Sequence, residues 1–392
     1  MERSGKHRGI RGWRQQGVWL ALWVWLPGVA LGAEGATNTP PSKPSRGYSY
    51  VHESEPGVPW SMHVVKVQLR HPDVELQTAM GRGESFSMAL VSDMARGWPA
   101  GSGQVVAAVN GDFYHQQDRY PGRPRDLQIC RGELVSAPDG HACFWIDAAG
   151  EPRMTNVVSR FRVVWPGGNS VPIGLNEERG AGSAVLYTSA VGASTRAPAG
   201  LVAVLERGTN TNWLPLAVGR TYAARVREVR QEADTALTAD TMVLSIAPGL
   251  VAGLPAVVAG MTLQVVTETF PKLEEVKVAI GGGPTLVRDG KAMQWNGLQA
   301  RHPRSAVGFN RDTVFLVEID GRQGNISLGM SFPELAAYMQ KLGCENAMNL
   351  DGGGSATLWV FGNVINSPSE GRERPSANAL VVVEKNRRTR RE

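Results

Sequence analysis

Short apolar, β-branched segments alternate with turns containing glycine or proline over most of the chain. Clear examples are residues 62–69, 105–109, 276–280, 314–319 and 380–383. This alternation is typical of β-strands joined by turns. We therefore expect an α+β protein whose single domain, at residues 48–384, is a mixed, sheet-rich structure with few helices.

The strongest helix signal covers residues 331–342. Ser331 can cap the helix, Glu334 completes a capping box, and apolar side chains recur at helical spacing from Leu335 to Leu342. Gly343 follows, as expected where a helix ends. A second, shorter helix is predicted at residues 87–94.

The helix at 331–342 lies between two strand-like segments, so the pattern predicts one βαβ unit at about 313–351. The first segment ends at Asp320 and the second at Asp351, and each aspartate is followed by glycine. Strands in such a unit are usually parallel and often adjacent. Both aspartates should then lie at the sheet edge where ligands commonly bind.

Two further strands end in the same way. Residues 105–109 run into Asn110-Gly111-Asp112, and residues 276–280 run into Gly281-Gly282-Gly283. Glycine allows the backbone to approach a ligand and to point its N–H groups at it. Four such turns predict one shared rim that faces a ligand.

The N-terminus has the order of a secretory signal. A basic stretch precedes the apolar run 17–31, which ends in Gly32-Ala33. We expect a signal peptide at 1–33, with an uncleaved anchor as the alternative, and a flexible linker at 34–47. The mature protein should be secreted or periplasmic, with no integral membrane domain beyond the signal segment.

The net charge of +5 arises from the two ends of the chain. Residues 1–16 carry five basic side chains and one acid, and residues 384–392 carry five basic side chains and two acids. The segment 385–392 is therefore a basic tail, and the remaining chain is slightly acidic. This distribution argues against nucleic acid as a partner.

Cysteine and histidine usage limits the chemistry further. A Cys130–Cys143 disulfide and three buried thiols, including Cys344, are both compatible with the sequence. The seven histidines show no metal-ligand spacing, and the motifs of serine hydrolases, zinc proteases and nucleotide-binding proteins are absent. Ser355 is therefore expected to form hydrogen bonds and not to act as a nucleophile.

Several motifs resemble the phosphodiester glycosidase family, which includes the mammalian mannose 6-phosphate uncovering enzyme and bacterial relatives of exopolysaccharide proteins. They are NGDFY (110–114), IGGGPTLVRDGK (280–291), RHPRSAVGF (301–309), DGRQGNISLGMSFPELA (320–336), LGCENAMNLDGGGSATLWV (342–360) and NSPSEGRERPSANALVV (366–382).

The resemblance implies a secreted hydrolase acting on a sugar whose anomeric oxygen belongs to a phosphodiester, with a phosphate-linked glycan as substrate. The family's polar positions correspond to Asn110, Asp112, Arg304, Asp320, Asn349, Asp351, Ser355, Arg374 and Asn378. The sugar, the aglycone and the oligomeric state stay open.

We expect Asp351, Asp320, Arg304 and Asp112 to be the catalytic residues. Asp351 or Asp320 would act at the sugar carbon as nucleophile, general base or electrostatic stabiliser. Arg304 and Arg374 would hold the phosphate. The backbone N–H groups assigned to the same task belong to Gly281, Gly282, Gly283, Gly352, Gly353 and Gly354. The side chains expected to bind sugar hydroxyls belong to Asn110, Asn349 and Asn378.

Two other interpretations fit the same residues. The sequence indicates no certain cofactor. In the first interpretation, Asp112, Asp320 and Asp351 would bind Ca²⁺ or Mg²⁺, and the ion would either stabilise the structure or serve a phosphodiesterase that cuts the P–O bond. In the second, the domain binds an anionic exopolysaccharide without cleaving it.

Overall fold

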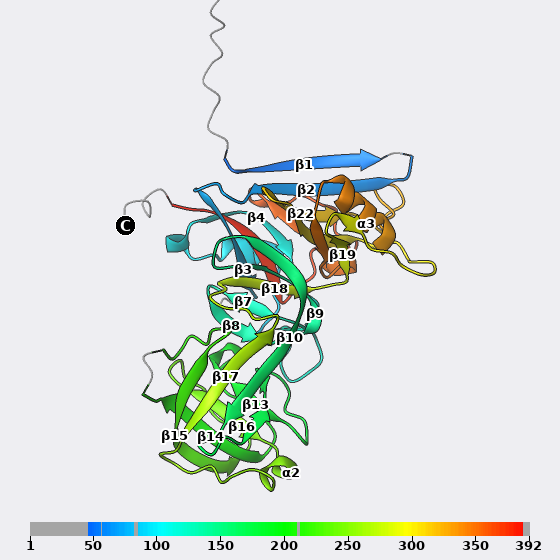
Figure 1. Ribbon diagram of the computed structural model, residues 1–392. Coiled ribbons are helices and arrows are strands. Elements are labelled where there is room, and N and C mark those ends of the chain that lie inside the picture. Colours follow the sequence, from blue (N-terminus) through cyan, green and yellow to red (C-terminus); the bar gives the residue numbers. More distant parts are fainter. Residues whose placement is uncertain (1–45, 56, 82–84, 210–211, 387–392) are drawn as a thin grey trace, which may run out of the picture. The chain divides into compact units, whose positions relative to one another are not determined.

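The computed structural model describes residues 46–55, 57–81, 85–209 and 212–386 (Figure 1). The expected signal peptide, the linker up to residue 45 and residues 387–392 of the basic tail lie outside this part of the chain. The described residues are mostly β-sheet, as expected from the alternation of apolar segments and turns.

The first sheet has seven strands, in the order β1-β2-β22-β21-β23-β19-β20. Their bounds are β1 Tyr48–Glu55, β2 Trp60–Gln68, β22 Thr313–Ile319, β21 Arg304–Phe309, β23 Asn346–Asn349, β19 Thr285–Arg288 and β20 Lys291–Ala292.

The second sheet has five strands, in the order β25-β24-β4-β26-β3. Their bounds are β25 Asn363–Val364, β24 Leu358–Val360, β4 Gln104–Asn110, β26 Asn378–Glu384 and β3 Val74–Met80.

The largest sheet has twelve strands, in the order β12-β13-β16-β14-β15-β17-β10-β9-β18-β7-β8, with β11 paired to β10. Their bounds are β7 Gln128–Cys130, β8 Glu133–Ser136, β9 Asp139–Ile146, β10 Pro152–Val164, β11 Ser170–Pro172, β12 Gly174–Leu175, β13 Ala184–Tyr187, β14 Gly200–Arg207, β15 Thr221–Glu232, β16 Met242–Ile246, β17 Thr262–Phe270 and β18 Val278–Gly282. A small hairpin joins β5 Tyr114–His115 to β6 Arg123–Pro124.

Helices are few within the described residues. They are α1 Val91–Arg96, α2 Pro248–Val251 and α3 Phe332–Lys341, with 3₁₀ turns η1 Ala100–Ser102, η2 Ser189–Val191 and η3 Gly353–Ser355. None of these helices has the length and apolar character that a membrane span requires.

The predicted helix at 331–342 is confirmed as α3, and the capping box between Ser331 and Glu334 is present. The shorter helix begins later than expected, at Val91. Residues before it are extended, because Ala89 forms a β-bridge with Ser376.

Apolar side chains stack the two smaller sheets and their helices into layers. Val307 and Leu316 of the seven-stranded sheet share a core with Val109 and Leu380 of the five-stranded sheet. The opposite face of the seven-stranded sheet packs against α3, and that of the five-stranded sheet packs against α1. The twelve-stranded sheet encloses a separate core.

The expected βαβ unit has a different pairing from the one predicted. β22 and β23 do run in the same direction, because each pairs antiparallel with β21. They are not adjacent, since β21 lies between them. β21 precedes β22 in the chain and is joined to it by a short turn. The connection from β22 through α3 to β23 therefore passes over β21. Among the named strand pairs, β12 and β13 are parallel.

The expected alternative of a Cys130–Cys143 disulfide is wrong. Cys143 Sγ donates to Asp126 Oδ1 at 3.2 Å, while Cys130 Sγ donates to the carbonyl of Thr78 at 3.1 Å. The sequence alternative of buried thiols is the one that the structure shows.

Candidate functional site

Backbone hydrogen bonds bring four chain segments together at the strand ends. The N–H of Gly111 donates to the carbonyl of Asn378 at 2.9 Å, and the N–H of Asp351 donates to the carbonyl of Gly111 at 2.9 Å. The N–H of Gly283 donates to the carbonyl of Asn349 at 2.7 Å. The turns after β4 and β23, the end of β18 and the start of β26 therefore meet in one region. Three of these segments are among the four glycine-bearing strand ends that were predicted to meet; the fourth predicted segment, Asp320-Gly321, is not joined to them by these bonds.

Asp351 is the half-buried carboxylate of this region. Its Oδ1 accepts a hydrogen bond from the N–H of Gly352 at 2.9 Å. Burial raises the pKa of Asp351 above its usual range, and a hydrogen bond from Ser355 and the charge of Arg374 oppose that rise. Arg374 in turn donates to Ser355 Oγ through Nε at 3.1 Å and Nη2 at 2.8 Å. An acid, a hydroxyl and a guanidinium thus form one chain of contacts.

The turn at Gly352–Gly354 depends on glycine because its neighbours approach very closely. A Cβ at position 352 would lie 2.7 Å from the carbonyl oxygen of Pro303, and one at 354 would lie 2.1 Å from Glu370 Oε1. Gly353 has a positive φ of 62°, and a Cβ there would lie 3.1 Å from a nitrogen of Arg322. The ends of the Glu370 and Arg322 side chains could move away from a larger residue, but the backbone carbonyl of Pro303 could not, so Gly352 is the position with the strictest requirement for glycine.

The end of β18 uses its glycines differently from the prediction. Gly281 and Gly282 lie within the strand, paired with Cys143 and Ala142 of β9, and do not form a turn. A Cβ at Gly281 would lie 2.5 Å from the Cβ of Asp126, and one at Gly282 would lie 2.7 Å from the carbonyl of Asn349. These two glycines allow close packing of the chain around the site.

Arg304 has a different environment from the one predicted. Its Nε donates to the carbonyl of Met330 at 2.9 Å and its Nη2 to that of Ala300 at 3.2 Å. The guanidinium lies 4.0 Å from the ring centre of Phe332. Burial lowers the pKa of Arg304 to about 10, and the charge of Arg322 adds to this effect. Neighbouring Ser305 points to the other face of the sheet, where it donates to Asn110.

The three asparagines expected to bind sugar hydroxyls are buried and bonded to the protein. Asn110 Nδ2 donates to the carbonyl of Asp351 at 2.7 Å, and Asn349 Nδ2 donates to that of Gly283 at 3.0 Å. Asn378 Oδ1 accepts from the N–H of Asp112 at 2.8 Å. These contacts connect the strand ends to one another, and the assignment of the three asparagines to sugar hydroxyls stays a prediction.

Asp112 lies beneath the rim and is 1% exposed. Its Oδ2 accepts from the N–H of Asp126 at 2.8 Å, while its Oδ1 has no hydrogen-bond partner. Burial, reinforced by the charge of Asp126, raises the pKa of Asp112 to about 7. Asp126 itself accepts hydrogen bonds from His141 Nδ1 at 2.8 Å and from the thiol of Cys143.

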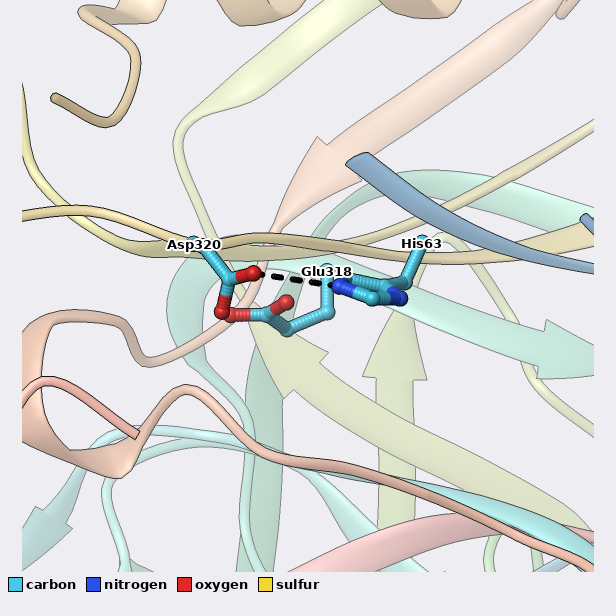
Figure 2. Close-up of side chains that lie close together, drawn as sticks. All are labelled: His63, Glu318 and Asp320. Atoms are coloured by element: carbon cyan, nitrogen blue, oxygen red, sulfur yellow. Dashed lines mark hydrogen bonds and ion pairs between the residues drawn. The ribbon is translucent and has the colours of Figure 1, made fainter. Parts of the chain in front are cut away.

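Asp320 is also buried, directly after the end of β22 in the seven-stranded sheet. Its Oδ2 accepts from Ser61 Oγ at 2.8 Å and contacts His63 Nε2 at 3.1 Å, and its Oδ1 accepts from the N–H of Ser367 at 2.6 Å. Figure 2 shows its carboxylate beside the imidazole of His63 and the carboxylate of Glu318. Among the described residues, the carboxylates that cluster at metal-binding distance are therefore Glu318 and Asp320, and not the set of Asp112, Asp320 and Asp351.

Two arginines near the site were missed by the sequence reasoning. Arg322 lies beside Gly353, and its place directly after Asp320-Gly321 was an available signal. Arg125 acts on the pKa values of both Asp112 and Asp351, and its guanidinium lies 4.5 Å from the ring centre of Phe113. Nothing in the sequence around Arg125 indicated this position.

Residues 218–383 match the family model described as phosphodiester glycosidase. This match confirms the family resemblance over the segment that carries the glycines at 281–283 and the turn at 351–355. The residues from 110 to 112 lie outside the matched segment.

One curated protein resembles part of this chain in sequence. The protein is similar to the SPbeta prophage-derived uncharacterized protein YomE of Bacillus subtilis (strain 168), at 36% identity over 106 residues, which are 26% of this chain and 16% of that relative. The chain thus spans a small part of the relative's length.

Two solved structures share the fold. A hypothetical protein from Synechocystis has a TM-score of 0.69 and 20% sequence identity to this protein. The alignment covers 86% of this chain and 62% of the Synechocystis chain. The second structure is a Burkholderia pseudomallei K96243 protein that is inferred to be exported. It has a TM-score of 0.62 and 21% sequence identity, and the alignment covers 83% of this chain and 74% of the Burkholderia chain.

Proposed function

We propose that this protein is an exported hydrolase that cleaves a glycosyl phosphodiester and releases a sugar and a phosphate monoester. The observation that carries this proposal is the contact chain of Asp351, Ser355 and Arg374 on a triple-glycine turn. The phosphodiester glycosidase match over residues 218–383 supports the reaction class. The similarity to a protein inferred to be exported supports the location.

Asp351 is assigned the reaction at the sugar carbon. It is half-buried, whereas Asp112 and Asp320 are 1% and 2% exposed, so it is the candidate acid that a substrate can reach. A raised pKa makes its carboxylate a stronger base toward water. The water oxygen bonds to the anomeric carbon, the bond from that carbon to the phosphate oxygen breaks, and Asp351 accepts the proton. The phosphate monoester leaves as a stable anion, so a strong general acid is not required.

The arginine side chains around the turn at Gly352–Gly354 are assigned to bind the phosphate of the substrate. Arg374 is partly exposed and already oriented by Ser355 and Glu370, and Arg322 approaches Gly353 from another side. An arginine fork can bind two phosphate oxygens at once. Arg304, with its carbonyl and ring contacts, is assigned to hold the adjoining segment in place.

The test uses purified protein in ¹⁸O-labelled water with phosphodiesters that resemble UDP-GlcNAc or teichoic acid. Mass spectrometry of the products should find the label in the sugar, which shows C–O cleavage. Label in the phosphate would refute the proposal in favour of a P–O phosphodiesterase. Saturable binding without products would refute it in favour of a glycan-binding domain.

A matched pair of variants links the reaction to the site. Asp351→Asn should lower turnover by about 10²–10³-fold or more, in line with the loss of one preorganised catalytic group. Asp312→Asn makes the same chemical change at a side chain that is 78% exposed, and it should leave turnover unchanged. Equal activity of both variants would remove Asp351 from the mechanism.

A further inference from the structure

Glu318 in β22 is a buried carboxylate without a hydrogen-bond partner. The residue is 0% exposed, and neither Oε1 nor Oε2 is hydrogen-bonded. Burial and the neighbouring charge of Asp320 raise its pKa well above the usual range, and a weaker contact from the Asn366 side chain opposes that rise. No ion pair of Glu318 with lysine or arginine is present in the described part of the chain. Buried charges in proteins are normally paired or bound to a metal, so this side chain requires an explanation.

The neighbours of Glu318 offer further metal ligands. His63 of β2 is its direct cross-strand partner, and Asp320 follows two residues later in the chain, just beyond the end of β22. One ligand atom from each of the three side chains lies within 4.8 Å of the others (Figure 2). His63 Nε2 and Asp320 Oδ2 are 3.1 Å apart. Two ligands at roughly 2.1 Å from a tetrahedral ion are about 3.4 Å apart, so this edge has a suitable length.

The orientation of His63 is fixed by a second contact. Its Nδ1 lies 2.8 Å from the hydroxyl of Tyr50, and its ring stacks on that of His52 at a centroid distance of 4.4 Å. Nε2 is therefore the nitrogen that faces the two carboxylates. Metal-bound histidines typically use their other nitrogen for a contact of this kind, which sets the ring orientation.

We propose that His63, Glu318 and Asp320 bind one divalent metal ion with nitrogen and oxygen ligands, Zn²⁺ or Mn²⁺. An imidazole together with carboxylates suits these ions better than Ca²⁺ or Mg²⁺, which prefer oxygen alone. Ser61 Oγ, at 2.8 Å from Asp320 Oδ2, is placed to complete the shell or to support it. The three side chains are 0–4% exposed, so the ion is structural and does not contact the substrate.

The ion would connect the core to the arginine of the proposed active site. Asp320 Oδ1 accepts from the N–H of Ser367, and Gln323 Nε2 donates to the carbonyl of Ser367 at 2.7 Å. The chain runs from Ser367 to Arg374, which contacts Ser355. A bound ion would thus fix Asp320 and, through it, the segment that carries Arg374.

The competing explanation is a proton shared between Glu318 and Asp320. Glu318→Gln separates the two explanations, because glutamine keeps the shape and can donate a hydrogen bond but is a poor metal ligand. Glu55→Gln is the matched control, since Glu55 is exposed on the adjacent strand β1. The protein is prepared without a histidine tag, unfolded with a chelator, refolded with Zn²⁺, Mn²⁺, Ca²⁺ or Mg²⁺, and desalted.

Elemental analysis should find about one Zn²⁺ or Mn²⁺ per chain in the wild type and in Glu55→Gln, with a higher thermal midpoint than the metal-free protein. Glu318→Gln and His63→Ala should bind the ion at least about 10-fold more weakly. Retention of no ion, retention of Ca²⁺ or Mg²⁺ alone, or undiminished retention by Glu318→Gln would overturn the proposal.

A spectroscopic measurement on the wild type avoids any dependence on variant folding. X-ray absorption of the zinc-loaded chain should show an oxygen and nitrogen shell with one imidazole. Sulfur in that shell would overturn the assignment. None of these readouts depends on turnover, so failure here is distinguishable from failure of the proposed hydrolase activity.

Discussion

Replacing Asp112 with asparagine should change how the stability of the protein depends on pH. Asp112 is buried, its Oδ1 has no partner, and its pKa is raised from 3.8 to about 7. Between these two values the folded state keeps a proton that the unfolded state has already lost. The free energy of unfolding therefore falls as the pH rises from about 4 to about 7, and this contribution is constant above pH 7.

The size of the effect follows from the shift itself. A displacement of roughly three pKa units corresponds to about 4 kcal/mol, since each unit is 1.36 kcal/mol. The carboxyl is buried, so solvent screening does not reduce this figure. Asparagine cannot ionise, and Asp112→Asn should remove the decline. Relative to wild type, the variant should gain about 4 kcal/mol in unfolding free energy between pH 4 and pH 8.

Urea unfolding followed by tryptophan fluorescence at pH 4 to 8 measures this difference directly. Asp312→Asn is the control, because its exposed side chain should leave the pH dependence of the wild type unchanged. Parallel curves for the wild type and Asp112→Asn, with a difference below about 1 kcal/mol across the range, would refute the reasoning from burial.

Three further outcomes are expected. Gly352→Ala should lower turnover at least about 10-fold, because its Cβ would lie 2.7 Å from the backbone carbonyl oxygen of Pro303, whereas Gly182→Ala, with open space around it, should have no effect on the measured rate. Arg304→Lys should reduce the free energy of unfolding in urea by about 1–3 kcal/mol through lost carbonyl and ring contacts, and Arg311→Lys on the surface should not. The raised pKa of Asp351 should place the acid limb of kcat/KM above the ordinary aspartate range, so activity falls as pH drops through that raised value; a limb at or below pH 3.8 would contradict its assignment as base.

Local patterns determined the position of several strands and of the main helix. α3 could be predicted because its signals are local: a capping residue, a proline in the first turn and a repeated apolar face. The strands at 62–69, 105–109 and 314–319 were predictable for the same reason, since β-branched runs between turns need no information about their partners.

The direction of individual side chains depended on the tertiary structure. Arg304 and Ser305 are neighbours in sequence but point to opposite faces of β21, and the pairing of β21 with β22 and β23 decides which face each one meets. The sequence indicated that Arg304 belongs to the region of the site, but not that its guanidinium packs on Phe332.

Asp320 illustrates the same limit. Its position at the end of β22 followed from the sequence, and its burial beside His63 did not, because β2 comes from the other end of the domain. Glu318 had no local signal at all, since a glutamate within a strand, two residues before Asp320, is ordinarily solvent-exposed. The sequence motifs and the turns indicated which segments carry the residues of the proposed active site. The registers between distant strands decided which of those side chains are accessible and which are buried, because a strand's pairing determines the face on which each side chain lies.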